Sequence, residues 1–155
     1  MFEKILVPLD GSEHSIHALE KAVQIAKKFA AKITLIYVYS VSPPVVVSPN
    51  AMAGSLPYEM TLPPEVLSKL VEAARGRGAN ILAHSEKRAK AERVQVETLL
   101  KEGHAVEEIL KTAKEGEFDL IVIGARGLST IKEIFLGSVS HGVTVHAPCP
   151  VLIVR

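Results

Sequence analysis

Four residues near the carboxyl end have the types and spacing that phosphate chemistry requires. Gly124 and Gly127 follow an apolar run, and nine residues separate Gly127 from Gly137-Ser138. Glycine lets a backbone approach a ligand closely because no Cβ intervenes. A helix that starts at Gly137-Ser138 would present unpaired N–H groups, which suit a phosphate. The pattern therefore predicts a cradle for the phosphates of a nucleotide.

A second polar feature, Asp10-Gly11-Ser12, follows the first apolar run of the chain. These residues form a turn after the predicted strand, and Ser12 can cap the helix that comes next. The alternatives are structural: glycines that only form a turn, an aspartate that only shapes one, and Ser138 as a simple N-cap. Taken with the spacing to Gly137-Ser138, the two features together favour nucleotide binding.

Strands and helices alternate along the chain, and these elements must position the polar residues. Apolar or alternating runs predict strands over residues 2–9, 32–39, 94–98, 118–123 and 150–154. Helical spacing of apolar residues predicts helices over 16–30, 65–89 and 106–113, with a fourth after Gly137. Gly76 and Gly78 interrupt the second helix and leave its continuity open, since each costs ~1 kcal/mol relative to alanine. Because Gly78 falls on the apolar stripe, close packing against the sheet would explain it.

This alternation predicts an α/β fold with an open, mainly parallel five-stranded sheet and helices on both faces. The first and fourth strands are the most apolar and should be central, whereas the alternating third strand should lie at an edge. The order 3-2-1-4-5 satisfies this with right-handed crossovers. Ligands bind where the strand order reverses, so Asp10 and Gly124 should face each other in one crevice.

The length and composition of the chain indicate its domain organisation and argue against some classes of partner. The 155 residues and 48% hydrophobic content predict one domain over 1–155. Within it, the proline-rich residues 40–64 are either a lid or an insertion without a role. A net charge of +1 gives no case for nucleic acid or a membrane surface, and no apolar run approaches the ~20 residues of a membrane helix. With one cysteine, Cys149, and no leader-like amino end, we expect a soluble cytoplasmic protein.

The other reactive side chains predict little chemistry. His14 and His17 lie three apart, but no cysteine or acidic partner completes a metal site, so solvated helix residues are favoured. Cys149 lies between two prolines and has no neighbouring base, which predicts a small buried apolar group rather than a nucleophile. We predict no catalytic residues and no metal held by the protein alone.

The motifs together resemble one known family. Val7-Pro8-Leu9-Asp10-Gly11-Ser12 resembles the opening of the universal stress proteins, and Gly124-x2-Gly127-x9-Gly137-Ser138 is similar to the signature of their ATP-binding branch with every spacing kept. The ending, from Gly137-Ser138-Val139-Ser140 to Ala147-Pro148-Cys149-Pro150 and the final strand, also resembles it. The likeness covers the whole chain as a single-domain member. It implies a Rossmann-like, adenine nucleotide α-hydrolase-like fold.

The resemblance also implies a set of site residues. Asp10, preceded by Pro8 and Leu9, matches the acidic residue beside the nucleotide, and Val38 matches the position whose backbone meets the adenine. The loop around the ribose and phosphates corresponds to Gly124, Gly127, Gly137, Ser138, Val139 and Ser140. The hydroxyls of Ser138 and Ser140 can donate to phosphate oxygens, and Asp10 could orient the ribose or a phosphate-bound Mg²⁺. Arg126 could pair a phosphate, although an arginine that points into solvent is favoured. The implied cofactors are ATP and its Mg²⁺.

The motifs and the resemblance leave three possible functions for the protein. The first is an ATP-binding regulator in the stress response with slow or no hydrolysis, because no activated nucleophile and no Gly-x4-Gly-Lys-Ser/Thr loop is present. The alternative is a dimeric interaction or scaffold protein with a non-functional pocket, and a third, a true hydrolase, would need a base that the sequence does not show. An apolar strand at a sheet edge needs a cover, so Val151–Val154 predicts an antiparallel homodimer, which the resemblance also implies.

Overall fold

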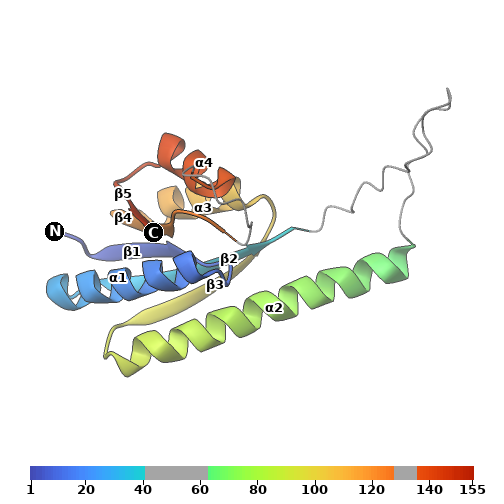
Figure 1. Ribbon diagram of the computed structural model, residues 1–155, viewed down its shortest axis with the longest axis horizontal. Coiled ribbons are helices and arrows are strands. Elements are labelled where there is room, and N and C mark those ends of the chain that lie inside the picture. Colours follow the sequence, from blue (N-terminus) through green and yellow to red (C-terminus); the bar gives the residue numbers. More distant parts are fainter. Residues whose placement is uncertain (41–62, 128–135) are drawn as a thin grey trace.

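The computed structural model describes residues 1–40, 63–127 and 136–155. Five strands and four helices alternate along these residues (Figure 1). The strands are β1 (Lys4–Pro8), β2 (Lys32–Tyr39), β3 (Val96–Glu102), β4 (Leu120–Gly124) and β5 (Val151–Val154). The helices are α1 (Glu13–Phe29), α2 (Pro64–Ala91), α3 (Ala105–Glu115) and α4 (Ser138–His146).

The strands form one parallel sheet in the order β3-β2-β1-β4-β5, which confirms the predicted order. All five residues of β4 are buried, as are four of the five in β1, because helices cover both faces at the centre of the sheet. The edge strand β3 is half-buried or exposed throughout. The reversal of strand order therefore falls between β1 and β4, where a crevice was expected.

Each face of the sheet has its own apolar core. Figure 1 shows α1 and α2 on one face and α3 and α4 on the other. The first core packs α1 and α2 against side chains such as Val7, Leu35 and Val122, whereas the second packs α3 and α4 against Leu6, Ile36 and Ile121. The central strands thus send alternate residues to opposite cores, which holds their carboxyl ends in a fixed arrangement.

Helix α2 is continuous through both of its glycines. Gly78 is buried, and a Cβ placed there would lie 2.5 Å from Cδ1 of Tyr37 and 2.8 Å from a methyl carbon of Leu100. The expected close packing against the sheet is therefore confirmed for Gly78. A Cβ at Gly76 would meet no atom within 4 Å, so that glycine only lowers helix propensity.

Strand β3 differs from its prediction. It begins at Val96 and ends at Glu102, whereas alternation predicted residues 94–98. The alternation stops because Leu99 packs in the core under α3 and α4 while Leu100, its neighbour, packs in the core under α1 and α2. A strand with apolar side chains on both faces loses the period of two that marks a half-buried strand.

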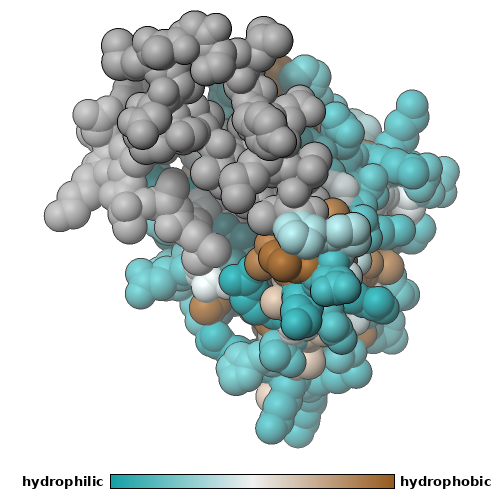
Figure 2. Space-filling view, turned by 90° about the vertical axis from the view of Figure 1, so that its right-hand side faces the viewer, coloured by the Kyte–Doolittle hydropathy of each residue, from teal (hydrophilic) through white to brown (hydrophobic). Residues whose placement is uncertain are grey.

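Of the predicted lid over 40–64, residues 41–62 lie outside the described residues. Among those that are described, no helix is long and apolar enough to cross a membrane. Viewed onto the carboxyl ends of the strands, the described surface is mostly hydrophilic, with a small hydrophobic area near its centre (Figure 2).

Candidate functional site: a cleft at the carboxyl ends of β1 and β4

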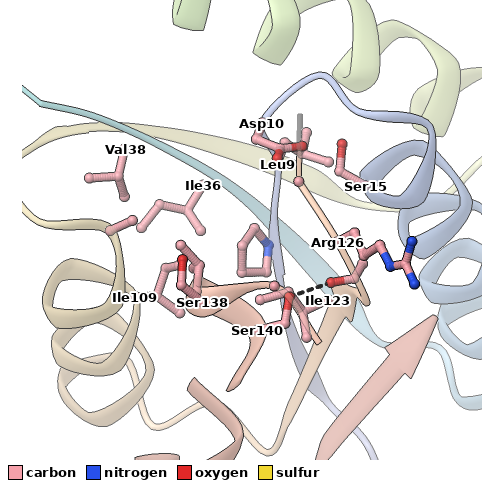
Figure 3. A pocket seen from close by; sticks show the side chains of 16 residues that line it. Leu9, Asp10, Ser15, Ile36, Val38, Ile109, Ile123, Arg126, Ser138 and Ser140 are labelled. Carbon is pink, nitrogen blue, oxygen red and sulfur yellow. Dashed lines mark hydrogen bonds between the residues drawn. The ribbon is translucent and has the colours of Figure 1, made fainter. Parts of the chain in front are cut away.

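A cleft of about 290 Å³ opens at the point where the strand order reverses (Figure 3). Its walls come from the carboxyl ends of β1, β2 and β4 and from the first turns of α3 and α4. All the site residues named from the sequence line it: Pro8, Leu9, Asp10, Val38, Gly124, Arg126, Gly127, Gly137, Ser138, Val139 and Ser140. The fold thus brings together residues from both ends of the chain.

Asp10 divides its two carboxylate oxygens between a turn and the cleft. Oδ1 accepts hydrogen bonds from the backbone N–H of Ser12 at 2.9 Å and from its hydroxyl at 2.5 Å. A Cβ placed at Gly127 would lie 2.5 Å from Oδ2. The turn-forming alternative is therefore correct for Oδ1, and it leaves Oδ2 beside the glycine loop.

The three loop glycines have different neighbours. A Cβ at Gly127 would meet the carboxylate of Asp10, whereas a Cβ at Gly124 would lie 2.7 Å from the carbonyl carbon of His14 at the start of α1. Gly124 thus allows close packing against α1, and Gly127 keeps the cleft open. The N–H of Gly137 donates to the carbonyl of Ala125 at 2.8 Å, which joins the start of α4 to the end of β4.

The two serines of α4 act differently. Helix α4 begins at Ser138, and its N-cap is Gly137 without a side-chain cap, so the N-cap alternative for Ser138 is wrong. Ser140 is 4% exposed, and its hydroxyl donates to the carbonyl of Gly124 at 2.6 Å. This partner differs from the phosphate expected for Ser140, because a hydroxyl has one proton to donate. Ser140 therefore ties the first turn of α4 to β4, and Ser138 remains at the cleft.

Arg126 lines the cleft, but its charged end does not face the serines of α4. Figure 3 shows its guanidinium directed away from Ser138 and Ser140. The carbonyl of Arg126 lies 3.4 Å from the hydroxyl of Ser12, and the residue is half-buried, which is less exposure than expected.

The other wall of the cleft is apolar. Ile36 and Val38 lie two apart on β2, and Ala105 and Ile109 lie four apart on α3, so each pair presents one face to the cleft. The sequence reasoning missed the lining residues Ser15, Ile36, Ala105, Ile109 and Ile123. The period of β2 could have identified Ile36 from Val38, whereas the α3 residues depend on how that helix packs.

The cleft thus combines an apolar wall with a polar end. At the polar end, the N–H groups of the first turn of α4 have no intrahelical partners and carry a partial positive charge. A planar ring suits the apolar wall, and an anion suits the start of α4. Among the described residues, no group of three histidine, cysteine, aspartate or glutamate side chains could hold a metal ion.

The remaining reactive groups lie outside the cleft chemistry. His17 is exposed, but His14 is half-buried with a buried Nδ1 that lacks a hydrogen-bond partner among the described residues, so its expected solvation is wrong. The backbone and Cβ of His14 lie against Gly124 at the end of β4. Burial, with the negative charge of Asp119, raises the pKa of the Cys149 thiol. A raised pKa disfavours the thiolate, which is the nucleophilic form, and Cys149 is half-buried rather than buried as expected.

Three similarities to known proteins fit this geometry. The sequence profile of the universal stress protein family matches residues 1–155. The chain is 38% identical over 155 residues to universal stress protein YxiE of Bacillus subtilis (strain 168), covering 100% of both chains. Universal stress protein UspA from Lactobacillus plantarum superposes with a TM-score of 0.81 at 28% identity, covering 99% of this chain and 98% of that one.

A further solved structure is of a universal stress protein in complex with cAMP. Its TM-score is 0.69 at 30% identity, over 99% of this chain and 97% of that one.

Proposed function

The chain belongs to the universal stress protein family, and on that premise we propose that its cleft binds an adenine nucleotide, ATP with Mg²⁺. The bound nucleotide would make the protein a regulator in the stress response. The observation that carries the proposal is the convergence of Asp10, Gly127 and the start of α4 on one apolar slot.

The geometry suggests how the ligand lies. The adenine ring would occupy the apolar wall made by Ile36, Val38 and Ile109, where the backbone of Val38 can read the edge of the ring. The ribose would then come to the corner where Oδ2 of Asp10 faces Gly127. The phosphates would reach the N–H groups at the start of α4 and the hydroxyl of Ser138.

An adenine nucleotide is the ligand class with direct support from a relative. The universal stress protein solved with cAMP is 30% identical to this chain and covers nearly all of it. Our choice of ATP rests on the spacing of Gly124, Gly127 and Gly137-Ser138, which is similar to the signature of the family's ATP-binding branch. Mg²⁺ would be held mainly by the phosphates, and Asp10 is the residue whose carboxylate would contribute to binding it.

We propose slow hydrolysis or none. Of the described residues that line the cleft, Asp10 is the only one with a carboxylate, and its Oδ1 is occupied by Ser12. A general base must reach the proton it removes and be free to accept it. A site with this lining suits retention of the nucleotide better than turnover.

We also propose a homodimer that pairs β5 across a two-fold axis. Among the described strands, β5 pairs with β4 alone, and its four residues are all apolar, with Leu152 38% exposed. Such an edge aggregates unless it is covered, and a second copy is the simplest cover. A chain with a single cysteine suits the reducing cytoplasm, which is where we place it.

Calorimetry on the purified protein tests the proposal. ATP, ADP, AMP and cAMP are titrated with and without Mg²⁺, with GTP as the control for the base. Saturable binding of at least one adenine nucleotide, and weaker binding of GTP, supports it. No binding of any adenine nucleotide would overturn it and leave the dimeric interaction protein with a non-functional pocket.

A further inference from the structure

Ser12 lies behind the cleft and joins three backbone segments. It is 6% exposed, and its hydroxyl oxygen accepts a hydrogen bond from the N–H of Ser15 at 3.2 Å as the N-cap of α1. The same hydroxyl lies 2.5 Å from Oδ1 of Asp10 and 3.4 Å from the carbonyl oxygen of Arg126. The hydroxyl thus touches α1, the turn after β1 and the glycine loop after β4.

The hydroxyl of Ser12 can donate a hydrogen bond to only one of its two possible acceptors at a time. A serine hydroxyl has one hydrogen to donate and two lone pairs. The distance of 2.5 Å to a carboxylate is typical of a charge-assisted bond, whereas 3.4 Å to the Arg126 carbonyl is long for a hydroxyl donor. In this structure the proton therefore goes to Asp10, and the backbone N–H of Ser12 gives Oδ1 a second donor at 2.9 Å.

The two bonds to Oδ1 determine where the other oxygen points. With Oδ1 held from the α1 side, Oδ2 is left beside Gly127, on the ligand side of the carboxylate. We propose that Ser12 is a positioning residue of this site, which acts on the nucleotide through the carboxylate of Asp10. This inference rests on the proposed function.

A purely structural role for Ser12 makes a different prediction. As an N-cap alone, it would stabilise α1, and its replacement by alanine would lower Tm by roughly 2–4 °C without a specific effect on ligand affinity. Glycine is nearly as good an N-cap as serine but has no hydroxyl. Ser12→Gly therefore separates the cap from the hydroxyl, and Ser12→Thr retains both.

The test measures the ATP dissociation constant of wild type and of Ser12→Ala, Ser12→Gly and Ser12→Thr, with Tm recorded for each. We expect about tenfold weaker binding for Ser12→Ala and Ser12→Gly. Ser12→Thr should restore the wild-type constant. Ser12→Ala is then repeated in an Asp10→Ala background, where it should cost nothing further, because a residue that acts through Asp10 has no effect once Asp10 is absent.

The outcomes separate this inference from the proposed function. Wild type that binds no adenine nucleotide overturns both. Wild type that binds, with Ser12→Gly at the wild-type affinity, overturns only the role of Ser12. The role is also overturned if Ser12→Ala weakens binding by the same factor with and without Asp10.

Discussion

Asp10 and Gly127 form the corner of the cleft: a Cβ at Gly127 would lie 2.5 Å from Oδ2 of Asp10. The two residues come from the loops after β1 and β4, the strands between which the sheet order reverses. A carboxylate against a glycine backbone leaves room for a polar ligand where any other residue would place a side chain.

Gly127→Ala should weaken ATP binding at least tenfold, because the new methyl group displaces Oδ2 of Asp10 or fills the corner. The fold should survive, since Gly127 is not among the described glycines with positive φ. Calorimetry measures the affinity. The matched control is Gly76→Ala, whose methyl group meets nothing within 4 Å and should leave binding unchanged. Equal affinities for the two variants would contradict the assignment of the corner.

The glycine pair of α2 should respond in opposite directions. Gly78→Ala forces a methyl group against the ring of Tyr37 and should reduce the free energy of unfolding by about 1–3 kcal/mol. Gly76→Ala should raise it by about 0.5–1 kcal/mol, because alanine is the better helix former. Urea denaturation monitored by circular dichroism measures both. A Gly78→Ala protein as stable as wild type would mean that α2 does not pack this closely on β2.

Leu152→Lys should shift the proposed dimer to monomer. Across a two-fold axis at β5, each new lysine would lie close to its copy, and like charges at adjacent positions of paired strands repel. Light scattering after size-exclusion chromatography reports the mass. Val66→Lys serves as the control, since Val66 is similarly exposed at 42% but lies on α2. A wild-type protein that is monomeric at micromolar concentration would remove the basis of the dimer.

Glu97 should contribute to stability only above acidic pH. The hydrogen bond from Lys32 lowers the pKa of Glu97 below its ordinary value of 4.5, against partial desolvation, and the hydroxyl of Thr34 lowers it further. The contribution is therefore complete above pH 4.5 and is lost as the pH falls through the lowered pKa of the folded chain. Both partners are about half exposed, so we expect at most ~1 kcal/mol.

Thermal unfolding of wild type and Glu97→Gln at several pH values checks this dependence. The two proteins should differ in Tm at pH 7 and converge as the medium becomes more acidic. A difference that persists below the lowered pKa would assign the effect to packing rather than to charge.

The strand order and the position of the cleft were predictable from sequence because both depend on local patterns. Continuous apolar runs identify buried central strands, and parallel topology brings the ends of β1 and β4 together. The partners of individual hydroxyls were not predictable in this way. Ser140 donates to Gly124, and Ser12 reaches both Asp10 and Arg126. These contacts depend on how α4 and α1 pack against the sheet, and the spacing of residues along the chain does not predict that packing.

The most direct test of nucleotide binding uses protein purified without added nucleotide. Wild type and Gly127→Val are denatured, and the released small molecules are separated by ion-exchange chromatography and quantified. We predict an adenine nucleotide, ATP foremost, in near-stoichiometric amount from wild type and little from the variant. No adenine nucleotide from wild type, together with no heat on titration with Mg-ATP, would contradict a nucleotide site in this cleft.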